Sequence, residues 1–414
     1  MSEIKDTQQH PKVEIAVKNF GPIAEADIDL RPLTVFVGPS NTGKTYFATL
    51  VYALHSIFFQ FSHTAKPIKK NIPHKLSSHH DAVELAFKRC FDVASVSDLE
   101  RFGGSNSDSL EVSLNLSDID LGNWHFRLRS GGGKVTLNEK RKGILSRPPN
   151  PEQNSEKCYY LPAARSGLLQ SYRVVAGSLM DLTLRSGNGP SEIPTFSAVT
   201  VDFMRHLTFH KENGKPAPEI QGIADALESE VLAGKIIVTT SQGGYPKYNY
   251  CPDGSAQEVS LTRTAAMVSE LAPLVLYLRG LVRPGDTLII EEPEAHLHPG
   301  AQADIAVILT RLVRAGVRVI ITTHSDWLLQ EISNLTLEGL LAEETDEPAS
   351  WLLPEEIGVW HCQKDEPVKE IPFHPREGIS PEDYEDVAEG LYNRSVNLQQ
   401  RFEKKKGEGE RESS

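Results

Sequence analysis

The chain has 414 residues, of which 39% are hydrophobic and 24% charged, so it can form two or three domain-sized units or one elaborated domain. Its 43 basic and 56 acidic residues give a formal net charge of −13, which argues against a protein that coats nucleic acid over its whole surface but is compatible with a local basic groove. The amino end lacks the apolar core of a signal peptide, and no window approaches the roughly 18 apolar residues of a membrane span, so we expect a cytoplasmic protein without membrane contact. The widely spaced cysteines form no C-x-x-C pair and indicate reduced thiols; they are Cys90, Cys158, Cys251 and Cys362.

The amino-terminal region predicts a β-hairpin followed by a buried strand. Residues 13–17 and 24–30 alternate between apolar and polar side chains, with a Phe20-Gly21-Pro22 turn between them. The apolar run 33–37 then reads as a strand buried on both faces. We expect the hairpin to form an antiparallel edge beside a parallel core.

The strand at 33–37 leads into a phosphate-loop pattern, in which a glycine, four free positions and Gly-Lys-Thr precede a helix over 46–54. Glycines allow backbone N–H groups to surround phosphate oxygens, and a helix N-terminus adds partial positive charge. We expect Lys44 to reach the β- and γ-phosphates of ATP and the Thr45 hydroxyl to bind Mg²⁺. The alternative is a glycine-rich turn that matches the pattern by chance. The predicted nucleotide-binding residues of the loop are Gly38, Pro39, Ser40, Asn41, Thr42, Gly43, Lys44 and Thr45.

The middle of the chain has a looser pattern. A helix is predicted over 82–91, and three short strands over 110–116, 124–128 and 135–137 indicate a β-meander inserted into the nucleotide domain. The proline-rich stretch 148–151 predicts a stiff linker after the meander.

Beyond this insertion, strand character returns at 159–162. A mostly helical stretch over 168–232 is interrupted at 187–190, and its last part, 220–232, has the spacing of an amphipathic helix. Strands over 235–238 and 245–250 predict a second hairpin.

Two carboxylates follow the next strong strand signal. After a helix over 264–280, the apolar run from Thr287 ends in Glu291 and Glu292. The carboxyl ends of parallel strands are where ligands bind in α/β folds. We expect Glu291 to hold Mg²⁺ through water and Glu292 to polarise the attacking water. The alternative is that two acids stand at a strand end by chance.

A histidine follows the last strong strand signal. The strand predicted over 317–323 is followed by His324, which at the same sheet edge would hydrogen-bond the γ-phosphate or the attacking water. The alternative is a structural histidine.

Three stretches carry a resemblance to a known family. The block 290–299, the stretch 322–325 and the amino-terminal stretch 19–23 resemble the ABC-type AAA ATPases of the overcoming-lysogenization-defect, RecF and SMC-like group, which includes many bacterial anti-phage ATPases. The likeness covers residues 12–55, 158–172 and 258–335. It implies an α/β fold of the ABC-type P-loop NTPase kind, with a mixed central sheet, an antiparallel β edge and an inserted β/helical region.

The resemblance also implies roles. Residues 38–45 correspond to Walker A, 289–292 to Walker B with glutamate at the usual aspartate position, and 293–298 to the D-loop, where two protomers meet. His324 corresponds to the switch histidine. Arg165 matches a motif found near the nucleotide, its alternative being a surface arginine at a strand end.

The signature segment departs from the family pattern. Residues 264–271 lack the signature glycine and leading serines and keep Ser269 as the expected contact to the nucleotide, which leaves trans-activated hydrolysis open. His296 and His298 suggest a turn or interface role, with metal ligation as the alternative.

On this basis the chain divides into six parts. They are 12–55, the first part of the ATPase domain; 56–157, the insertion; 158–260, the second strand motif and a helical subdomain; 261–335, the second part of the ATPase domain; 336–398, a carboxyl-terminal extension with a strand at 356–362 and a helix at 383–391; and 399–414, a disordered tail.

No Asp-x-Asp pair follows residue 334, so a Toprim nuclease module is not expected and the effector would be separately encoded. We therefore predict an ATPase whose homodimer sandwiches ATP and Mg²⁺ and acts as a switch on DNA or on an effector in phage defence. The alternatives are an ATP-gated scaffold with little turnover and a DNA-repair or chromosome-maintenance ATPase.

Overall fold

The computed structural model describes residues 11–62, 79–101, 109–118, 122–131, 134–142, 156–171, 196–208, 217–240, 245–342 and 350–379, with isolated positions at 174, 394, 396 and 399. The linker predicted at 148–151, the interruption at 187–190, the helix at 383–391 and nearly all of the tail lie outside the described residues.

The central sheet has six strands in the order β14-β13-β3-β12-β11-β7. Five of them run parallel, and β14 pairs antiparallel with β13 at the edge. Every residue of β3, β11, β12 and β13 is buried, as expected for parallel strands covered on both faces. The predicted α/β class with a mixed central sheet is confirmed. The bounds are β3 Leu33–Val37, β7 Cys158–Leu161, β11 Thr287–Glu291, β12 Arg318–Thr323, β13 Ile357–His361 and β14 Lys369–Ile371.

A second, antiparallel sheet corrects one prediction. The amino-terminal hairpin does not flank the parallel strands: its strand β1 pairs with β4, in a five-stranded sheet of order β2-β1-β4-β5-β6. The strands expected to form a separate meander therefore complete the sheet that the hairpin begins. Local patterns predict each strand but not its pairing partner, because β1 and β4 are almost a hundred residues apart. The bounds are β1 Lys12–Phe20, β2 Ile23–Asp29, β4 Leu110–Asp118, β5 Gly122–Gly131 and β6 Lys134–Lys142.

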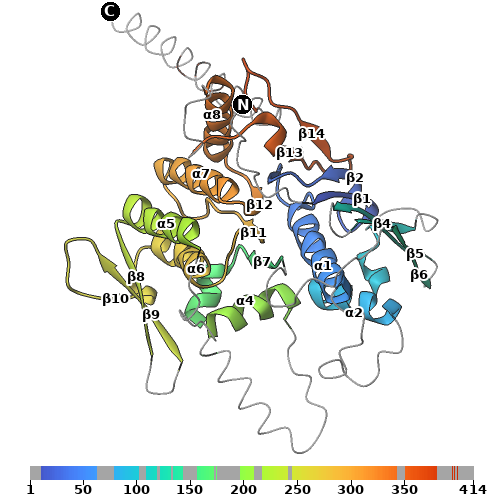
Figure 1. Ribbon diagram of the computed structural model, residues 1–414, viewed down its shortest axis with the longest axis horizontal. Coiled ribbons are helices and arrows are strands. Elements are labelled where there is room, and N and C mark those ends of the chain that lie inside the picture. Colours follow the sequence, from blue (N-terminus) through green and yellow to red (C-terminus); the bar gives the residue numbers. More distant parts are fainter. Residues whose placement is uncertain are drawn as a thin grey trace, which may run out of the picture.

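The elements form layers on either side of the central sheet (Figure 1). Alternate residues of one strand enter two different cores: Val35 packs with helices α5 to α8, whereas Phe36 packs with α1, α2 and the antiparallel sheet. The helices are α1 Lys44–Ser62, α2 His79–Phe91, α4 Ala198–Thr208, α5 Pro218–Ala226, α6 Ala266–Gly280, α7 Pro299–Arg314 and α8 Asp326–Leu341.

A small third sheet lies beside α5 and α6 (Figure 1) and includes the second predicted hairpin. Its strands are β8 Gly234–Thr240, β9 Pro246–Pro252 and β10 Val259–Ser260. The helix predicted over 220–232 is α5 followed by a π-helical turn, Leu227–Leu232, which ends at Ala233 in the left-handed region. Short 3-10 turns occupy Val96–Leu99, Leu261–Arg263 and Pro354–Glu356. None of the described helices is long and apolar enough to cross a membrane.

Candidate nucleotide-binding site

The phosphate loop connects the buried strand β3 to α1, and two of its glycines stand where no side chain fits. Gly38 has φ +134°, and a Cβ there would lie 2.2 Å from the carbonyl oxygen of Cys362. Gly43 has φ +104°, and its Cβ would lie 2.4 Å from Ile23. The glycines thus let the loop turn tightly between β13 and the amino-terminal hairpin.

The amino-terminal turn supports the start of α1. Gly21 lies against the ring of Tyr46, and a Cβ at Gly21 would come within 2.6 Å of that ring. The N–H of Gly21 donates to the carbonyl of Leu99 at 2.7 Å, which fixes the turn from its other side. This packing explains why the stretch 19–23 accompanies the phosphate loop: it forms the wall behind it.

Lys44 lies in the loop with its cation turned inward. Its side chain is buried, and Nζ donates to the carbonyl oxygens of Gly38 at 2.7 Å and Pro39 at 2.6 Å. Burial lowers the pKa of Lys44, while the negative charges of Glu292 and Glu294 act to raise it. A buried ammonium among backbone groups and glycines suits a multiply charged anion such as a triphosphate. Thr45, the next residue, is exposed at the first turn of α1.

The strand register brings the other predicted residues to the same edge. Val37 at the end of β3 pairs with Thr323 of β12, and Thr322 pairs with Glu291 of β11. Because the strands are parallel, the residues that follow them, Glu292 and His324, leave the sheet on the side of the phosphate loop.

Glu291 is held by the protein through both carboxylate oxygens. One accepts a hydrogen bond from the hydroxyl of Tyr160, and the other accepts from the N–H of Ala163 at 2.9 Å. The Tyr160 hydroxyl also lies 3.4 Å from Oγ1 of Thr49, one turn along α1 from Thr45. Burial raises the pKa of Glu291, opposed by these hydrogen bonds. A carboxylate accepts up to about four hydrogen bonds, so Glu291 retains acceptor capacity for a water of a Mg²⁺ shell, and the pair Thr45 and Glu291 fits such an ion.

Glu292 and His324 face each other across the end of the sheet. Oε1 of Glu292 lies 3.9 Å from Nε2 of His324, and both side chains are partly exposed. Glu292 has φ +43°, a left-handed backbone conformation that is unusual outside glycine and that turns the chain sharply after β11. Burial and the nearby ammonium of Lys44 lower the pKa of His324, with Glu292 opposing them. The imidazole is therefore neutral at neutral pH and can both donate and accept hydrogen bonds.

Glu294 is a site residue that the sequence placed only within the D-loop. Its Oε1 accepts from Oγ1 of Thr323 at 2.7 Å and from the N–H of His324 at 2.8 Å, so it fixes the backbone at His324. Burial raises the pKa of Glu294. In the sequence, Glu294 is marked by its position two residues after Glu292. That position alone does not distinguish it from an acidic residue on the protein surface.

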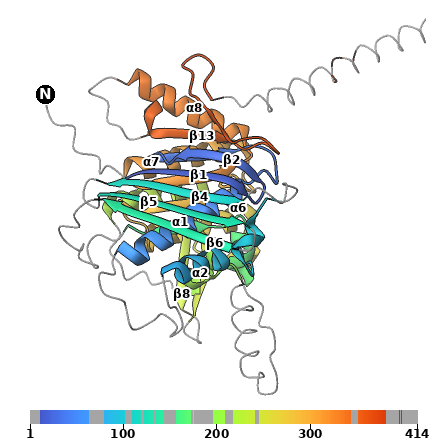
Figure 2. The same ribbon diagram turned by 90° about the vertical axis from the view of Figure 1, so that its right-hand side faces the viewer.

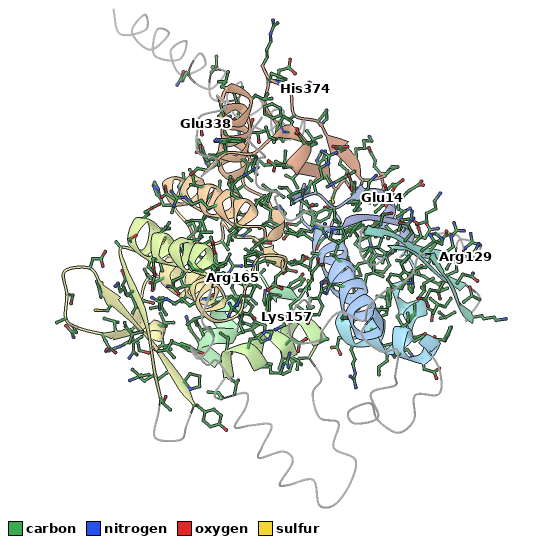
Figure 3. The ribbon with its side chains drawn as sticks, in the orientation of Figure 1. Glu14, Arg129, Lys157, Arg165, Glu338 and His374 are labelled. Atoms are coloured by element: carbon green, nitrogen blue, oxygen red, sulfur yellow. The ribbon has the colours of Figure 1, made fainter. Side chains whose placement is uncertain are left out.

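Arg165 is buried, with 1% of its surface exposed, which excludes the surface-arginine alternative. Nη1 donates to the carbonyl of Glu291 at 2.5 Å, Nη2 to that of Glu292 at 3.0 Å, and Nε to that of Glu270 on α6 at 3.1 Å. Nε also forms an ion pair with the Glu270 carboxylate at 3.1 Å. Arg165 thus joins helix α6 to the end of β11 and positions the two carboxylates, while a direct contact to nucleotide stays a prediction. Figure 3 shows Arg165 in the interior beside α6.

Ser269 requires a correction. It was expected to contact nucleotide across a dimer, but it is 1% exposed, and its hydroxyl donates to the carbonyl of Leu261 at 2.8 Å within its own chain. Ser269 lies near the start of α6, on the side that packs inward, so the helix turns this hydroxyl away from any partner. Ala265 and Ala266 at the helix start are exposed, and the polar residues exposed beside them, Thr262 and Arg263, belong to the preceding 3-10 turn.

The two histidines of the D-loop are exposed, and His298 has a turn role. Its Nδ1 accepts from the N–H of Gly300 at 3.2 Å and caps α7. His296 has φ +62° within the loop. No cluster of three metal-ligating side chains occurs in the described part of the chain.

Comparison with known proteins gives one family match and several distant structural ones. The family model described as "AAA domain, putative AbiEii toxin, Type IV TA system" matches residues 268–330, which span α6 through the start of α8. No curated protein shows significant sequence similarity to the chain.

Three of the structural matches are SMC heads. The SMC head bound to the C-terminal winged-helix domain of ScpA has 12% identity and a TM-score of 0.48, over 89% of this chain and 99% of the other. The head domain from Thermotoga maritima has 11% identity and a TM-score of 0.43, over 88% and 100%. The head with an extended coiled coil, bound to a ScpA domain derived from Pyrococcus furiosus, has 14% identity and a TM-score of 0.46, over 87% and 96%. Likenesses at this level give no information on partners or function. The AAA match, together with the phosphate-loop geometry of the chain itself, supports a nucleotide-binding ATPase.

Proposed function

We propose that the chain binds ATP with Mg²⁺ at the carboxyl edge of the central sheet and hydrolyses it. The observation that carries this proposal is the meeting of segments far apart in sequence. The strand β3, which leads to the loop of Lys44, pairs with β12, which pairs with β11, and the residues after these last two strands, His324 and Glu292, lie 3.9 Å apart. A sheet edge with a purely structural role does not require the buried ammonium of Lys44, the carboxylate of Glu292 and the neutral imidazole of His324 at one place.

The side chains would divide the chemistry. Lys44 neutralises phosphate charge, and Glu292 accepts a proton from the attacking water. His324 hydrogen-bonds the terminal phosphate or that water as a neutral ring. Thr45 and Glu291 hold Mg²⁺, which supplies electrostatic stabilisation of the phosphate oxygens when bound.

We further propose that two copies of the chain enclose two nucleotides and that closure acts on a separately encoded effector, in phage defence, with DNA as a second partner. Support comes from the exposed His296 and His298 in the segment directly after Glu292 and from the motif resemblance. The toxin–antitoxin wording of the matching family model is compatible with a defence role.

A second function, an ATP-gated scaffold with little turnover, is favoured by the burial of Ser269. In that case nucleotide would bind and close the dimer, but the partner copy would add little to the chemistry because the Ser269 hydroxyl is buried and hydrogen-bonded within its own chain.

Glu292→Gln tests the proposal. It keeps the shape and hydrogen bonding of the side chain but removes the base, so phosphate release should fall about 10²- to 10⁴-fold while ATP binding persists. ATP should then shift this variant to a dimer in light scattering. Rapid phosphate release by the variant, equal to that of the wild type, would reject Glu292 as the base. Slow turnover by both the wild type and the variant, together with ATP-dependent dimerisation, would favour the ATP-gated scaffold.

A further inference from the structure

The antiparallel sheet has one face in the core and one in solvent. Figure 2 looks onto its solvent face, with β2, β1, β4, β5 and β6 side by side. Apolar residues of these strands, such as Val13, Leu114 and Phe126, point inward to α1 and α2. The residues between them therefore point outward, following the alternation of a strand.

The charges on the solvent face are segregated. On β2 and β1 the outward side chains are acidic or paired: Lys12 lies 2.7 Å from Glu14, and Lys18 lies 2.8 Å from Glu25. At the other end of the sheet, cations and neutral polar groups dominate, and we call that half the β5–β6 face. Its exposed residues are Asn123, Arg127 and Arg129 on β5 and Lys134, Thr136, Asn138 and Lys140 on β6, with His125 half-buried among them.

One carboxylate, Glu111, lies among the described outward side chains of β4, β5 and β6, and it does not neutralise the β5–β6 face. It is 15% exposed and pairs with Arg127 at 2.5 Å and with Arg129 at 2.7 Å. The two arginines nevertheless keep 44% and 51% of their side-chain surfaces exposed. Lys134 and Lys140 form no ion pair with any residue that the structure describes. Four cations against one acid stand out in a chain with a net charge of −13.

We propose that the β5–β6 face binds the phosphate backbone of duplex nucleic acid. Cations interspersed with Asn and Thr side chains supply the ion pairs and hydrogen bonds that phosphate oxygens accept. Nine residues of β6 at about 3.4 Å each span about 30 Å, which matches about nine base pairs of duplex.

The composition of the β5–β6 face favours duplex nucleic acid over single strands and over a membrane surface. The two large aromatic residues of β5, Trp124 and Phe126, point inward, so neither ring is available to stack on the bases of a single strand. The imidazole on this face, His125, is half-buried and hydrogen-bonded to Asn115. No large apolar side chain is exposed on the face, as insertion into a membrane surface would require. Backbone contacts of this kind bind duplexes without reading their sequence.

This surface is separate from the phosphate loop and does not rest on the ATPase proposal. Figure 3 shows Arg129 on the outer flank of the molecule and Arg165 in the interior.

The test is fluorescence anisotropy of the full chain with a duplex of about 30 base pairs over a series of NaCl concentrations. Four phosphate contacts predict a slope of log affinity against log salt of about −3.6. The double variant Lys134→Gln with Lys140→Gln should reduce the slope to about −1.8 and weaken binding at every salt concentration. The matched control, Lys12→Gln with Lys18→Gln, removes the same charge from the same sheet and should leave the slope near −3.6.

Three results would overturn the proposal: no duplex binding at low salt, equal loss in the two double variants, or single strands of the same length binding as tightly as duplex. Vesicles containing anionic lipid serve as a further arm. If the Lys134 and Lys140 variant loses vesicle binding but keeps duplex binding, the face is a membrane surface and the assignment is wrong. Matching thermal unfolding of all variants establishes that the effect is not misfolding.

Discussion

The carboxyl edge of the central sheet and the β5–β6 face of the antiparallel sheet both carry several charged groups, but they hold them differently. At the sheet edge, Arg165 is buried and its donors go to the backbone of Glu270, Glu291 and Glu292. On the outer face, Arg129 pairs with Glu111, its one partner among the residues that the structure describes, and keeps half of its side chain in solvent. The first arrangement fixes geometry, as catalysis requires, and the second leaves charge free for a partner whose position varies.

The sharpest way to test this contrast is to remove each arginine. Arg165→Ala leaves the fully buried Glu270 carboxylate without its cation and removes the side-chain hydrogen bonds to the carbonyls of Glu291 and Glu292, so the free energy of unfolding should fall by about 3–5 kcal/mol. Arg129→Ala removes an exposed pair and should cost about 0–1 kcal/mol. Urea unfolding measures the free energy of unfolding of both variants. A similar loss of stability in the two would contradict the proposed difference between the buried and the exposed arginine.

A smaller effect is expected from the phosphate loop. Gly38→Ala places a methyl group 2.2 Å from the Cys362 carbonyl at a positive φ, so β13 and the loop must separate. Strain of this kind costs about 1–3 kcal/mol, which predicts ATP binding weaker by about 5- to 150-fold. Gly222→Ala, in helix α5 with no atom within 4 Å of the new methyl group, is the matched control and should leave binding unchanged. Unchanged ATP titration of Gly38→Ala would show that the close approach of β13 is not needed.

The smallest expected effect is on pH dependence. Because the pKa of His324 is lowered below its ordinary 6.5, the ring stays neutral above that value, and hydrolysis should change little between about pH 7 and 8. Protonation sets in only below 6.5, so an acid limb should appear there in the wild type. The His324→Asn variant should hydrolyse ATP more slowly than the wild type. Its pH profile should lack the part of the acid limb that arises from protonation of the imidazole. A limb centred above pH 6.5 in the wild type would contradict the neutral ring.

The sequence was informative where function depends on local pattern. The phosphate loop needs a strand, glycines and Lys44 in succession, and the two acids and the histidine stand at the ends of strands, so each could be placed at the sheet edge without knowledge of the fold. The α/β class followed from the same strands. The expected dimer, effector and nucleotide contacts remain proposals.

Long-range pairing could not be read from the sequence. Tyr160 holds Glu291 from a different strand, Arg165 reaches two distant segments, and β1 pairs with β4 instead of flanking the parallel strands. Ser269 shows the converse: a residue type kept by the motif is turned inward by the helix that carries it. Such outcomes depend on which faces pack together, and neighbouring residues in the chain do not determine that.

The most direct test of the central claim, that these segments meet around a triphosphate, is calorimetric titration of Mg²⁺–ATP into the wild type, Lys44→Ala and the control Lys235→Ala in strand β8. Loss of a charge-assisted contact worth about 1.5–3 kcal/mol predicts affinity lower by about 10- to 150-fold in Lys44→Ala and unchanged in the control. Equal ATP affinity in Lys44→Ala and the wild type would contradict the claim.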